Sequence, residues 1–292
     1  MTTLPPDQSN LLPHDALKGV RLGISVSESP DLARLGLLEM HFTLALGEIA
    51  RCVLVSGGKL AYGGSLRPDG YTPFLVQELH RYSRRDRPLL LCLGCGEHRT
   101  LPLSALAEQK AALGLIGSLV CLDADGNAID PAVGRSEQPE PPLDVSAQTK
   151  SLTSLRRYLT AQTQGRILLG GRREGFHGDM PGVLEEAIIA IESQQPIYLA
   201  GGFGGVTIDI VGALSVDDTS WLPQLPNAPA NDVRLTAGLG KLQTLRAEPN
   251  WPGLNNGLSD DENVRLARTY RPSEIAALIS LGLGRLAAPP SP

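Results

Sequence analysis

The residues best suited to chemistry lie in one glycine-rich stretch of the chain. It reads Gly170-Gly171-Arg172-Arg173-Glu174 and continues, after a short loop, as Met180-Pro181-Gly182-Val183-Leu184-Glu185-Glu186. Arginine pairs with phosphate, and a carboxylate near a helix start can accept the hydroxyl groups of a ribose. Glycine at a strand end lets a phosphate or a ribose touch the backbone. The stretch therefore predicts a nucleotide site.

The adjacent carboxylates Glu185 and Glu186 have different expected roles. Consecutive residues on a helix point about 100° apart, so at most one of the two faces a site. We expect Glu186 to hold ribose hydroxyls, with Arg172 or Arg173 adding positive charge. In an enzyme, Glu185 or Glu186 would stabilise an oxocarbenium-like ribosyl cation while Arg173 orients a phosphate. Glu185, Glu186 and Arg173 are thus the catalytic candidates.

Three other segments end predicted strands with small or polar residues. Residues 62–67, Tyr-Gly-Gly-Ser-Leu-Arg, combine backbone N–H groups, a hydroxyl and a guanidinium, which suits either a phosphate cradle or a tight turn. Residues 201–205, Gly-Gly-Phe-Gly-Gly, require close backbone contact with a ligand or with another packed element. Residues 25–27, Ser-Val-Ser, place hydroxyls where a phosphate or ribose could bind, although serine is also common at strand ends. The expected ligand-binding residues are Ser25, Ser27, Gly63, Gly64, Ser65, Arg67, Gly170, Gly171, Arg172, Pro181, Gly182, Glu186, Gly201, Gly202, Phe203 and Gly204.

Two of the four cysteines, Cys92 and Cys95, have the two-residue spacing of a redox or zinc motif. They lie at the end of the apolar run 88–93, where cysteine is a common small hydrophobe. No second cysteine pair or nearby histidine pair completes a tetrahedral site. We therefore interpret them as core residues and expect no metal and no required cofactor.

Alternating strands and helices position these segments. Short apolar runs predict strands, and the longer segments between them predict helices, a pattern typical of an open parallel sheet with right-handed crossovers. The predicted class is α/β: a Rossmann-like, mostly parallel sheet flanked by helices, with a C-terminal helical appendage. The expected strands are 20–27, 60–65, 88–93, 116–122, 166–171 and 196–200, and the expected helices include 35–54, 73–83, 104–113, 151–164, 181–193, 235–245 and 273–281.

Composition divides the chain into three parts. Residues 1–18 are polar and proline-rich and read as a flexible arm, residues 19–220 as the nucleotide-binding α/β domain, and residues 221–292 as a helical extension packed on the same domain. Residues 127–148 lack periodicity and are rich in proline, which predicts a surface excursion or an insertion. Ser259 and Glu262 have the spacing of a helix capping box.

Size and charge limit the possible classes of function. A chain of 292 residues that is 42% apolar and 20% charged is typical of a soluble globule. A formal net charge of -5 argues against bulk nucleic-acid binding, which would need a basic face. No run approaches the roughly 18 apolar residues of a membrane span, and the first residues have no signal-peptide pattern. We expect a cytoplasmic protein without membrane or nucleic-acid partners.

Together these residues resemble the SLOG superfamily of Rossmann-like domains, which includes the lonely-guy phosphoribohydrolases, the DNA-processing Smf/DprA domain and the N-terminal TRPM domain. The resemblance covers most of residues 20–282 and rests on the segments 25–31, 62–67, 181–186, 201–205 and 255–263. The last two segments are most similar to the branch found beside sirtuin-like and TIR domains in bacterial anti-phage systems. That branch implies binding of NAD-derived signals such as cyclic ADP-ribose isomers.

One departure from the lonely-guy pattern affects the expected activity. Those enzymes carry Pro-Gly-Gly-x-Gly-Thr-x-x-Glu, whereas residues 181–186 here read Pro-Gly-Val-Leu-Glu-Glu, without the second glycine and the Gly-Thr pair. The resemblance therefore implies nucleotide binding more than hydrolysis.

The favoured hypothesis is a sensor of an ADP-ribose-like nucleotide in bacterial defence or stress signalling, acting through a homo-oligomer or a separate effector protein. The alternatives are an N-glycosidase that releases a base from a nucleotide and an interaction scaffold with a vestigial cleft. A fold alone does not decide among them.

Overall fold

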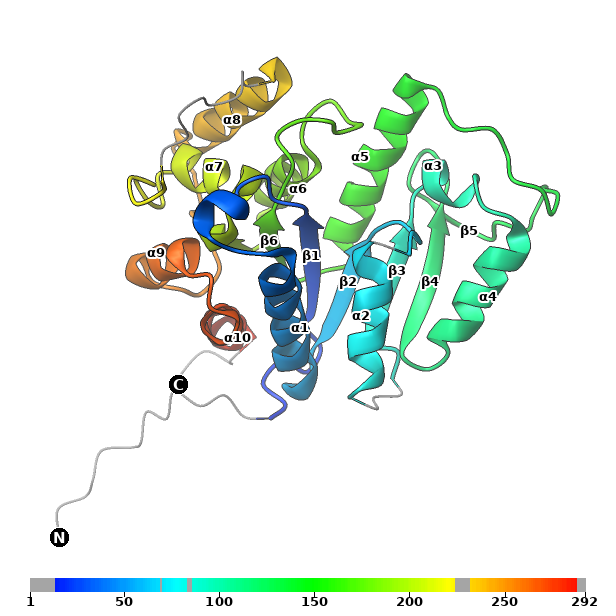
Figure 1. Ribbon diagram of the computed structural model, residues 1–292, viewed down its shortest axis with the longest axis horizontal. Coiled ribbons are helices and arrows are strands. Elements are labelled where there is room, and N and C mark those ends of the chain that lie inside the picture. The colour runs from blue at the N-terminus through cyan, green and yellow to red at the C-terminus, as the bar shows by residue number, and fades with distance from the viewer. Residues whose placement is uncertain (1–13, 69, 83–85, 224–231, 288–292) are drawn as a thin grey trace, which may run out of the picture.

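A central sheet with helices on both faces organises the chain (Figure 1). The computed structural model describes residues 14–68, 70–82, 86–223 and 232–287. Within these ranges the sheet has seven strands in the order β5-β4-β3-β2-β1-β6-β7, and every neighbouring pair is parallel except β4 and β5. The predicted α/β, Rossmann-like class is confirmed. The strands are β1 Arg21–Ser27, β2 Lys59–Gly63, β3 Leu89–Leu93, β4 Gly117–Leu122, β5 Ala128–Ile129, β6 Gly165–Gly170 and β7 Ile197–Ala200.

The chain changes direction across the sheet at β1. It runs outward from β1 through β2 and β3 to β4, then crosses back to place β6 on the other side of β1. β1 pairs with β2 through Ile24 and Tyr62 and with β6 through Ser27 and Gly170. The order of strands therefore reverses between β1 and β6. In open α/β sheets, ligands bind outside the carboxyl ends of the strands at such a switch point.

The helices form one layer on each face of the sheet. α1, α2 and α10 share a hydrophobic core with one face, and α5 and α6 pack against the other. Alternation along β1 makes this possible: Leu22 and Ile24 enter the core under α1, whereas Gly23 and Ser25 face α5 and α6. The helical elements are η1 Ala33–Leu35, α1 Glu39–Val55, α2 Tyr71–His80, α3 Cys95–His98, α4 Leu103–Leu113, α5 Val145–Ala161, α6 Gly182–Glu192, η2 Gly201–Phe203, α7 Gly205–Ala213, α8 Val233–Arg246, α9 Asp260–Arg268 and α10 Pro272–Ala287.

Two predicted helices begin four or more residues away from the expected start. The helix expected from residue 35 starts at Glu39, because Gly36 adopts a left-handed conformation with φ of 70° and ends the short η1 turn. The helix expected from residue 151 starts earlier, at Val145. Its N-cap is Asp144, whose side chain accepts a hydrogen bond of 2.8 Å from the backbone N–H of Ala147.

The segment 127–148 is a surface excursion that is fastened to the fold. It contains β5 and the first residues of α5. Arg135 anchors its middle, because the guanidinium donates to the carbonyl oxygens of His98, the last residue of α3, and of Arg99 and Leu101 after it. These carbonyls lie at the C-terminal end of α3, so the arginine caps that end of the helix.

The C-terminal helices belong to the main core. Ile275, Ile279 and Leu283 of α10 lie in the same buried cluster as Leu22 and Phe42. The capping box at the start of α9 forms as predicted, and α10 continues to Ala287, beyond the expected end. Residues 1–13 of the expected N-terminal arm lie outside the described residues. In the described ranges, no helix is both long and apolar enough to cross a membrane.

Candidate functional site

A cavity of about 340 Å³ lies at the switch point between β1 and β6. Its walls are the loop after β1 and the loop after β6, so it occupies the place where the topology predicts a ligand. The volume is at the lower end of small-molecule sites and fits part of a nucleotide. The lining residues are Glu28, Ser29, Pro30, Asp31, Arg172, Arg173 and Glu174.

Arg173 is held rigidly at this cavity by two aspartates. Its Nη1 lies 2.9 Å from Oδ1 of Asp31, and its Nε and Nη2 lie 2.7 and 2.9 Å from the carboxylate oxygens of Asp209. Arg34 forms a second ion pair with Asp31, with its Nε 2.9 Å from Oδ1 of Asp31. Two arginines and two carboxylates thus neutralise one another, and of these four Arg173 and Asp31 line the cavity. Bidentate pairing of this kind holds the Arg173 side chain in one orientation and also neutralises its charge.

Asp31 also occupies the N-terminus of α7. Its Oδ2 accepts a hydrogen bond of 2.7 Å from the backbone N–H of Gly205, the position at which helices commonly bind anions. Burial alone would raise the pKa of Asp31, but the hydrogen bonds from Arg173, Arg34 and the Gly205 N–H outweigh it and hold the pKa below its usual range. A β-carbon at Gly204 would overlap the Asp31 side chain. An internal carboxylate therefore fills the anion position of this helix.

Arg172 is the more available cation of the cavity. It pairs with Glu28 at 2.7 Å, and the two side chains are 51% and 62% exposed. Exposed ion pairs of this kind contribute about 0–1 kcal/mol. A ligand phosphate could therefore replace Glu28 as the partner of Arg172 at little cost.

The two candidate glutamates lie in a buried ionic network. Glu186 accepts a hydrogen bond from Ser25 and one of 2.9 Å from Nη1 of Arg166, while Glu185 pairs with Arg156. Nη1 of Arg166 also lies 2.9 Å from the Ser25 hydroxyl, and the arginine is fully buried. Neither glutamate lines the switch-point cavity. Ser25 and Glu186, both expected to bind the ligand, are thus hydrogen-bonded to each other in one network between the sheet and α6.

Sequence reasoning did not identify Arg156 and Arg166 as partners of the glutamates. Arg166 stands inside an otherwise apolar strand, next to Ile167 and Leu168. A charged residue at such a position needs a buried counter-charge, which is a signal in the sequence that one could have used. Arg156 gives no comparable signal, because α5 carries polar residues around most of its surface.

At several of the expected ligand-binding glycines, contacts within the chain explain why a larger residue would not fit. A β-carbon at Gly63 would overlap Leu159 of α5, and one at Gly202 would overlap the Thr269 carbonyl oxygen after α9. Gly170 and Gly171 have φ of 66° and 109°, and their carbonyl oxygens accept hydrogen bonds from the start of α7. The sequence predicted that residues 201–205 contact either a ligand or another packed element, and the structure shows contact with the residues at the end of α9. Their contact with a ligand stays a prediction.

The remaining site residues are dispersed around the carboxyl edge. Ser65 and Arg67 follow β2; the carbonyl of Ser65 accepts a hydrogen bond of 2.6 Å from Thr72, and Arg67 is exposed. Ser27 lies at the end of β1 opposite Gly170. Four more predicted residues have structural roles: Pro181 is the N-cap of α6, Gly182 lies next to Arg156, Gly201 packs on Ala267, and Phe203 meets Phe42 edge to face at 5.3 Å.

The cysteines show no sign of a shared site. Cys92 is buried in β3, as interpreted from the sequence, and burial raises the pKa of its thiol to about 12. Cys95, also interpreted as a core residue, is instead partly exposed at the start of α3, and both thiols are free. Across residues 14–68, 70–82, 86–223 and 232–287, no three His, Cys, Asp or Glu side chains gather in a way that could hold a metal ion.

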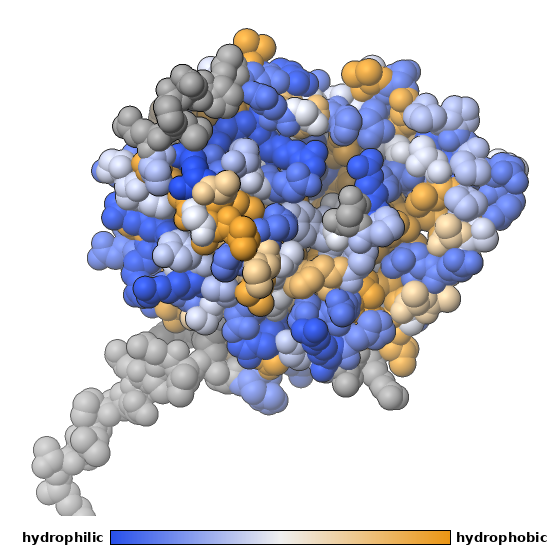
Figure 2. All heavy atoms as spheres, in the orientation of Figure 1, coloured by the Kyte–Doolittle hydropathy of each residue, from blue (hydrophilic) through white to orange (hydrophobic). Residues whose placement is uncertain are grey.

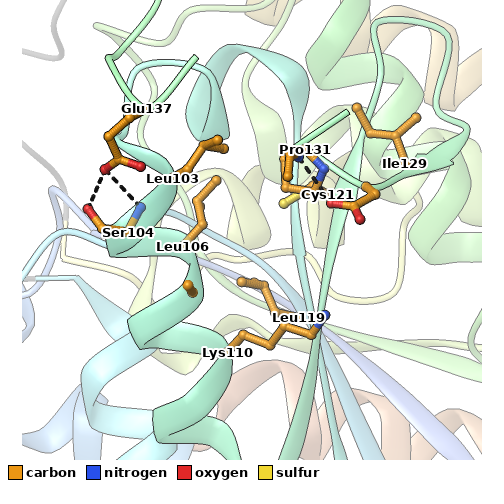
Figure 3. A pocket seen from close by; sticks show the side chains of 12 residues that line it. Leu103, Ser104, Leu106, Lys110, Leu119, Cys121, Ile129, Pro131 and Glu137 are labelled. Atoms are coloured by element: carbon orange, nitrogen blue, oxygen red, sulfur yellow. Dashed lines mark hydrogen bonds between the residues drawn. The ribbon is translucent and has the colours of Figure 1, made fainter. Parts of the chain in front are cut away.

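A roomier cavity of about 510 Å³ lies at the β4–β5 end of the sheet (Figure 3). Leu103, Leu106 and Leu119 give it an apolar wall. Glu137, which also lines it, accepts a hydrogen bond of 2.6 Å from the Ser104 hydroxyl. None of the predicted site residues lines it. Its position away from the switch point makes it the weaker candidate for a nucleotide.

Comparison with known proteins identifies the family. A family model described as SLOG cluster2 matches residues 16–266, and the chain therefore belongs to this SLOG family. A search of curated proteins found no match. The family supports a nucleotide-related domain. The resemblance to the branch found beside sirtuin-like and TIR domains stays a prediction.

Proposed function

We propose that this SLOG-family chain binds an ADP-ribose-like nucleotide, an NAD-derived signal, at the carboxyl edge of the sheet between β1 and β6. By binding this signal, the chain would act as a sensor in a bacterial defence or stress-signalling system. The observation that carries the proposal is the switch-point cavity with Arg172 on its wall, paired only with the exposed Glu28 among the described residues. Because that pair is weak, phosphate oxygens can compete for the guanidinium.

The cavity offers the other groups that such a ligand needs. Glu28 and Glu174 line it and can accept hydrogen bonds from ribose hydroxyls. Ser29 adds little, because its hydroxyl already donates to the Phe203 carbonyl oxygen at 2.6 Å. A ligand longer than the cavity would extend along the carboxyl edge toward Arg67 after β2, since β1 and β2 are parallel neighbours.

Binding is better supported than hydrolysis. Both glutamates that could act on a glycosidic bond are engaged by arginines, Glu185 by Arg156 and Glu186 by Arg166, and neither lines the cavity. A group that stabilises a ribosyl cation must lie against the reacting sugar.

Isothermal titration with ADP-ribose, cyclic ADP-ribose isomers, NAD and AMP tests the proposal. At least one of these nucleotides should bind, and Arg172→Ala should weaken it roughly 10- to 100-fold, because a hydrogen bond to a charged group contributes about 1.5–3 kcal/mol. The matched control is Arg271→Ala, which removes an exposed arginine remote in sequence from the cavity loops. Equal affinities of the two variants, or no binding by any of the four ligands, would refute the proposed site.

Mass spectrometry of the same samples distinguishes a sensor from an enzyme. A sensor returns the nucleotide intact after incubation. Release of free base would instead establish an N-glycosidase and overturn the sensor proposal.

A further inference from the structure

The exposed apolar side chains of the molecule are concentrated at one helix. Large apolar residues are exposed at eleven positions in the described ranges, and four of these lie on α1 or at the residue before it. Leu38, Met40, Leu44 and Val55 are 62%, 58%, 55% and 50% exposed. Figure 2 shows apolar side chains gathered over η1 and the start of α1. Scattered exposed apolar residues are ordinary, but a group on one helix indicates a contact surface.

Five exposed or half-buried residues of α1 form one stripe. Met40, Leu44, Glu48, Arg51 and Val55 follow one another at spacings of four, four, three and four residues, which places them within about 80° of the helix circumference. The opposite side of α1 enters the core. α1 lies between α2 and α10 in its layer, so the stripe faces away from the sheet (Figure 1).

An ion pair occupies the middle of this stripe. Nε of Arg51 lies 2.9 Å from the Glu48 carboxylate, and the two side chains are 43% and 25% exposed. An apolar residue stands on each side, Leu44 toward the N-terminus and Val55 toward the C-terminus. The stripe therefore reads apolar, acidic, basic, apolar.

This order is complementary to itself across a twofold axis. In an antiparallel pair of α1 helices, the register that places Leu44 opposite Val55 of a second chain also places Glu48 opposite the second Arg51. The second chain makes the same two contacts in return. Each carboxylate then has two guanidinium groups beside it, and the apolar residues cover one another. Isologous dimers need this kind of self-complementary patch.

We propose that the α1 stripe is a self-association surface whose occupant is the α1 stripe of a second copy of this chain. One helix face buries less than the roughly 800 Å² per partner of a standard interface. Flanking residues such as Tyr82, just after α2, must therefore contribute, and the dimer should be weak and dependent on concentration. This proposal stands independently of the nucleotide site.

Sedimentation velocity of the full chain over a range of concentrations gives the first test. The weight-average mass should rise from the 31.0 kDa of one chain toward twice that value. Leu44→Glu should abolish the rise, because it places a carboxylate among apolar contacts. The control Leu115→Glu alters a residue that is 51% exposed outside α1 and should leave association unchanged. A wild-type chain that stays monomeric, or a Leu44→Glu variant that still dimerises, would overturn the proposal.

A charge exchange tests the register itself. Glu48→Arg gives a stripe with two cations and Arg51→Glu a stripe with two anions, so each variant alone should dimerise at least about tenfold more weakly than the wild type. An equimolar mixture should recover association through a mixed dimer. A folding defect could not produce this recovery. If either variant dimerises as the wild type does, or if the mixture stays monomeric, the antiparallel register is wrong.

Discussion

Glu186→Ala should destabilise the fold by about 3–5 kcal/mol, because it leaves Arg166 as a buried charge without a counter-charge. The Arg166 side chain is 1% exposed and lies 2.9 Å from Glu186. Burial lowers the pKa of the Arg166 guanidinium, and the nearby Glu186 carboxylate opposes that effect. An arginine stays protonated even so, so it cannot escape the cost by losing its proton.

The size of the effect comes from Arg166 alone. Arg156 also faces Glu186, at 3.8 Å, but it keeps its partner Glu185 in the variant. At this chain length one kcal/mol shifts the melting temperature by about 2 °C, so Tm should fall by roughly 6–10 °C. The matched control is Glu192→Ala on the same helix. Glu192 pairs with Lys241, and the two side chains are 41% and 48% exposed, so the loss should stay within about 1 kcal/mol.

Urea unfolding followed by circular dichroism should compare the wild type, Glu186→Ala, Arg166→Met and the double variant. Removing both charges should cost less than the sum of the single changes by about 1–3 kcal/mol, because no charge is then left unpaired. A single Glu186→Ala cost below about 1 kcal/mol, or additive single costs, would refute the network. Nucleotide affinity per folded molecule should stay unchanged, since Glu186 does not line the cavity.

Two further outcomes follow from the packing of the C-terminal helices. Gly202→Ala should destabilise the fold by about 3 kcal/mol, because its β-carbon would overlap the Thr269 carbonyl oxygen, whereas Gly240→Ala on α8, where a β-carbon meets nothing, should stabilise it by about 0.5–1 kcal/mol. Thermal unfolding of both variants checks this, and a Gly202→Ala Tm equal to that of the wild type would contradict it. The hydrogen bond from Arg285 lowers the pKa of Glu262 from 4.5 to about 2. Since this folded-state pKa lies below the unfolded value, the stabilisation is complete above about pH 4.5 and is lost as the pH falls toward 2. The urea midpoints of the wild type and Glu262→Gln should therefore differ at pH 6 and converge near pH 2; a constant difference would show that ionisation is not the cause.

The six parallel strands were predictable because burial on both faces of a parallel sheet requires nearly continuous apolar runs, whereas β5, whose two residues are exposed, was not expected. β6 lies within one residue of its expected bounds, 166–171. The start of α5 was not predictable in the same way. Its first turn is exposed, with Val145 at 82%, so it shows no apolar periodicity, and the prolines before Asp144 obscure the cap.

The convergence of the strand ends could be predicted, but the side-chain pairings at that edge could not. Glycine-ended strands in a parallel sheet converge on one edge, which correctly brings the ends of β1, β2 and β6 together. The bonds that decide the roles of single residues join distant positions, such as Asp31 to Gly205 and Ser25 to Arg166. One sequence gives no measure of such pairings, and it favoured Glu186 for the ligand although Arg166 holds that carboxylate.

These internal pairings restrict where an anionic ligand can bind along the edge. A phosphate approaching Arg173 would also approach the carboxylates of Asp31 and Asp209, which lie within 2.9 Å of that guanidinium. Repulsion from two carboxylates offsets the attraction of one arginine. The N-terminus of α7 is closed to anions for the same reason, because Asp31 already accepts its first N–H. Arg172 has a single exposed counter-charge that can turn away into solvent. The proposed affinity for a nucleotide must therefore depend on Arg172, while Arg173 maintains the shape of the cavity wall.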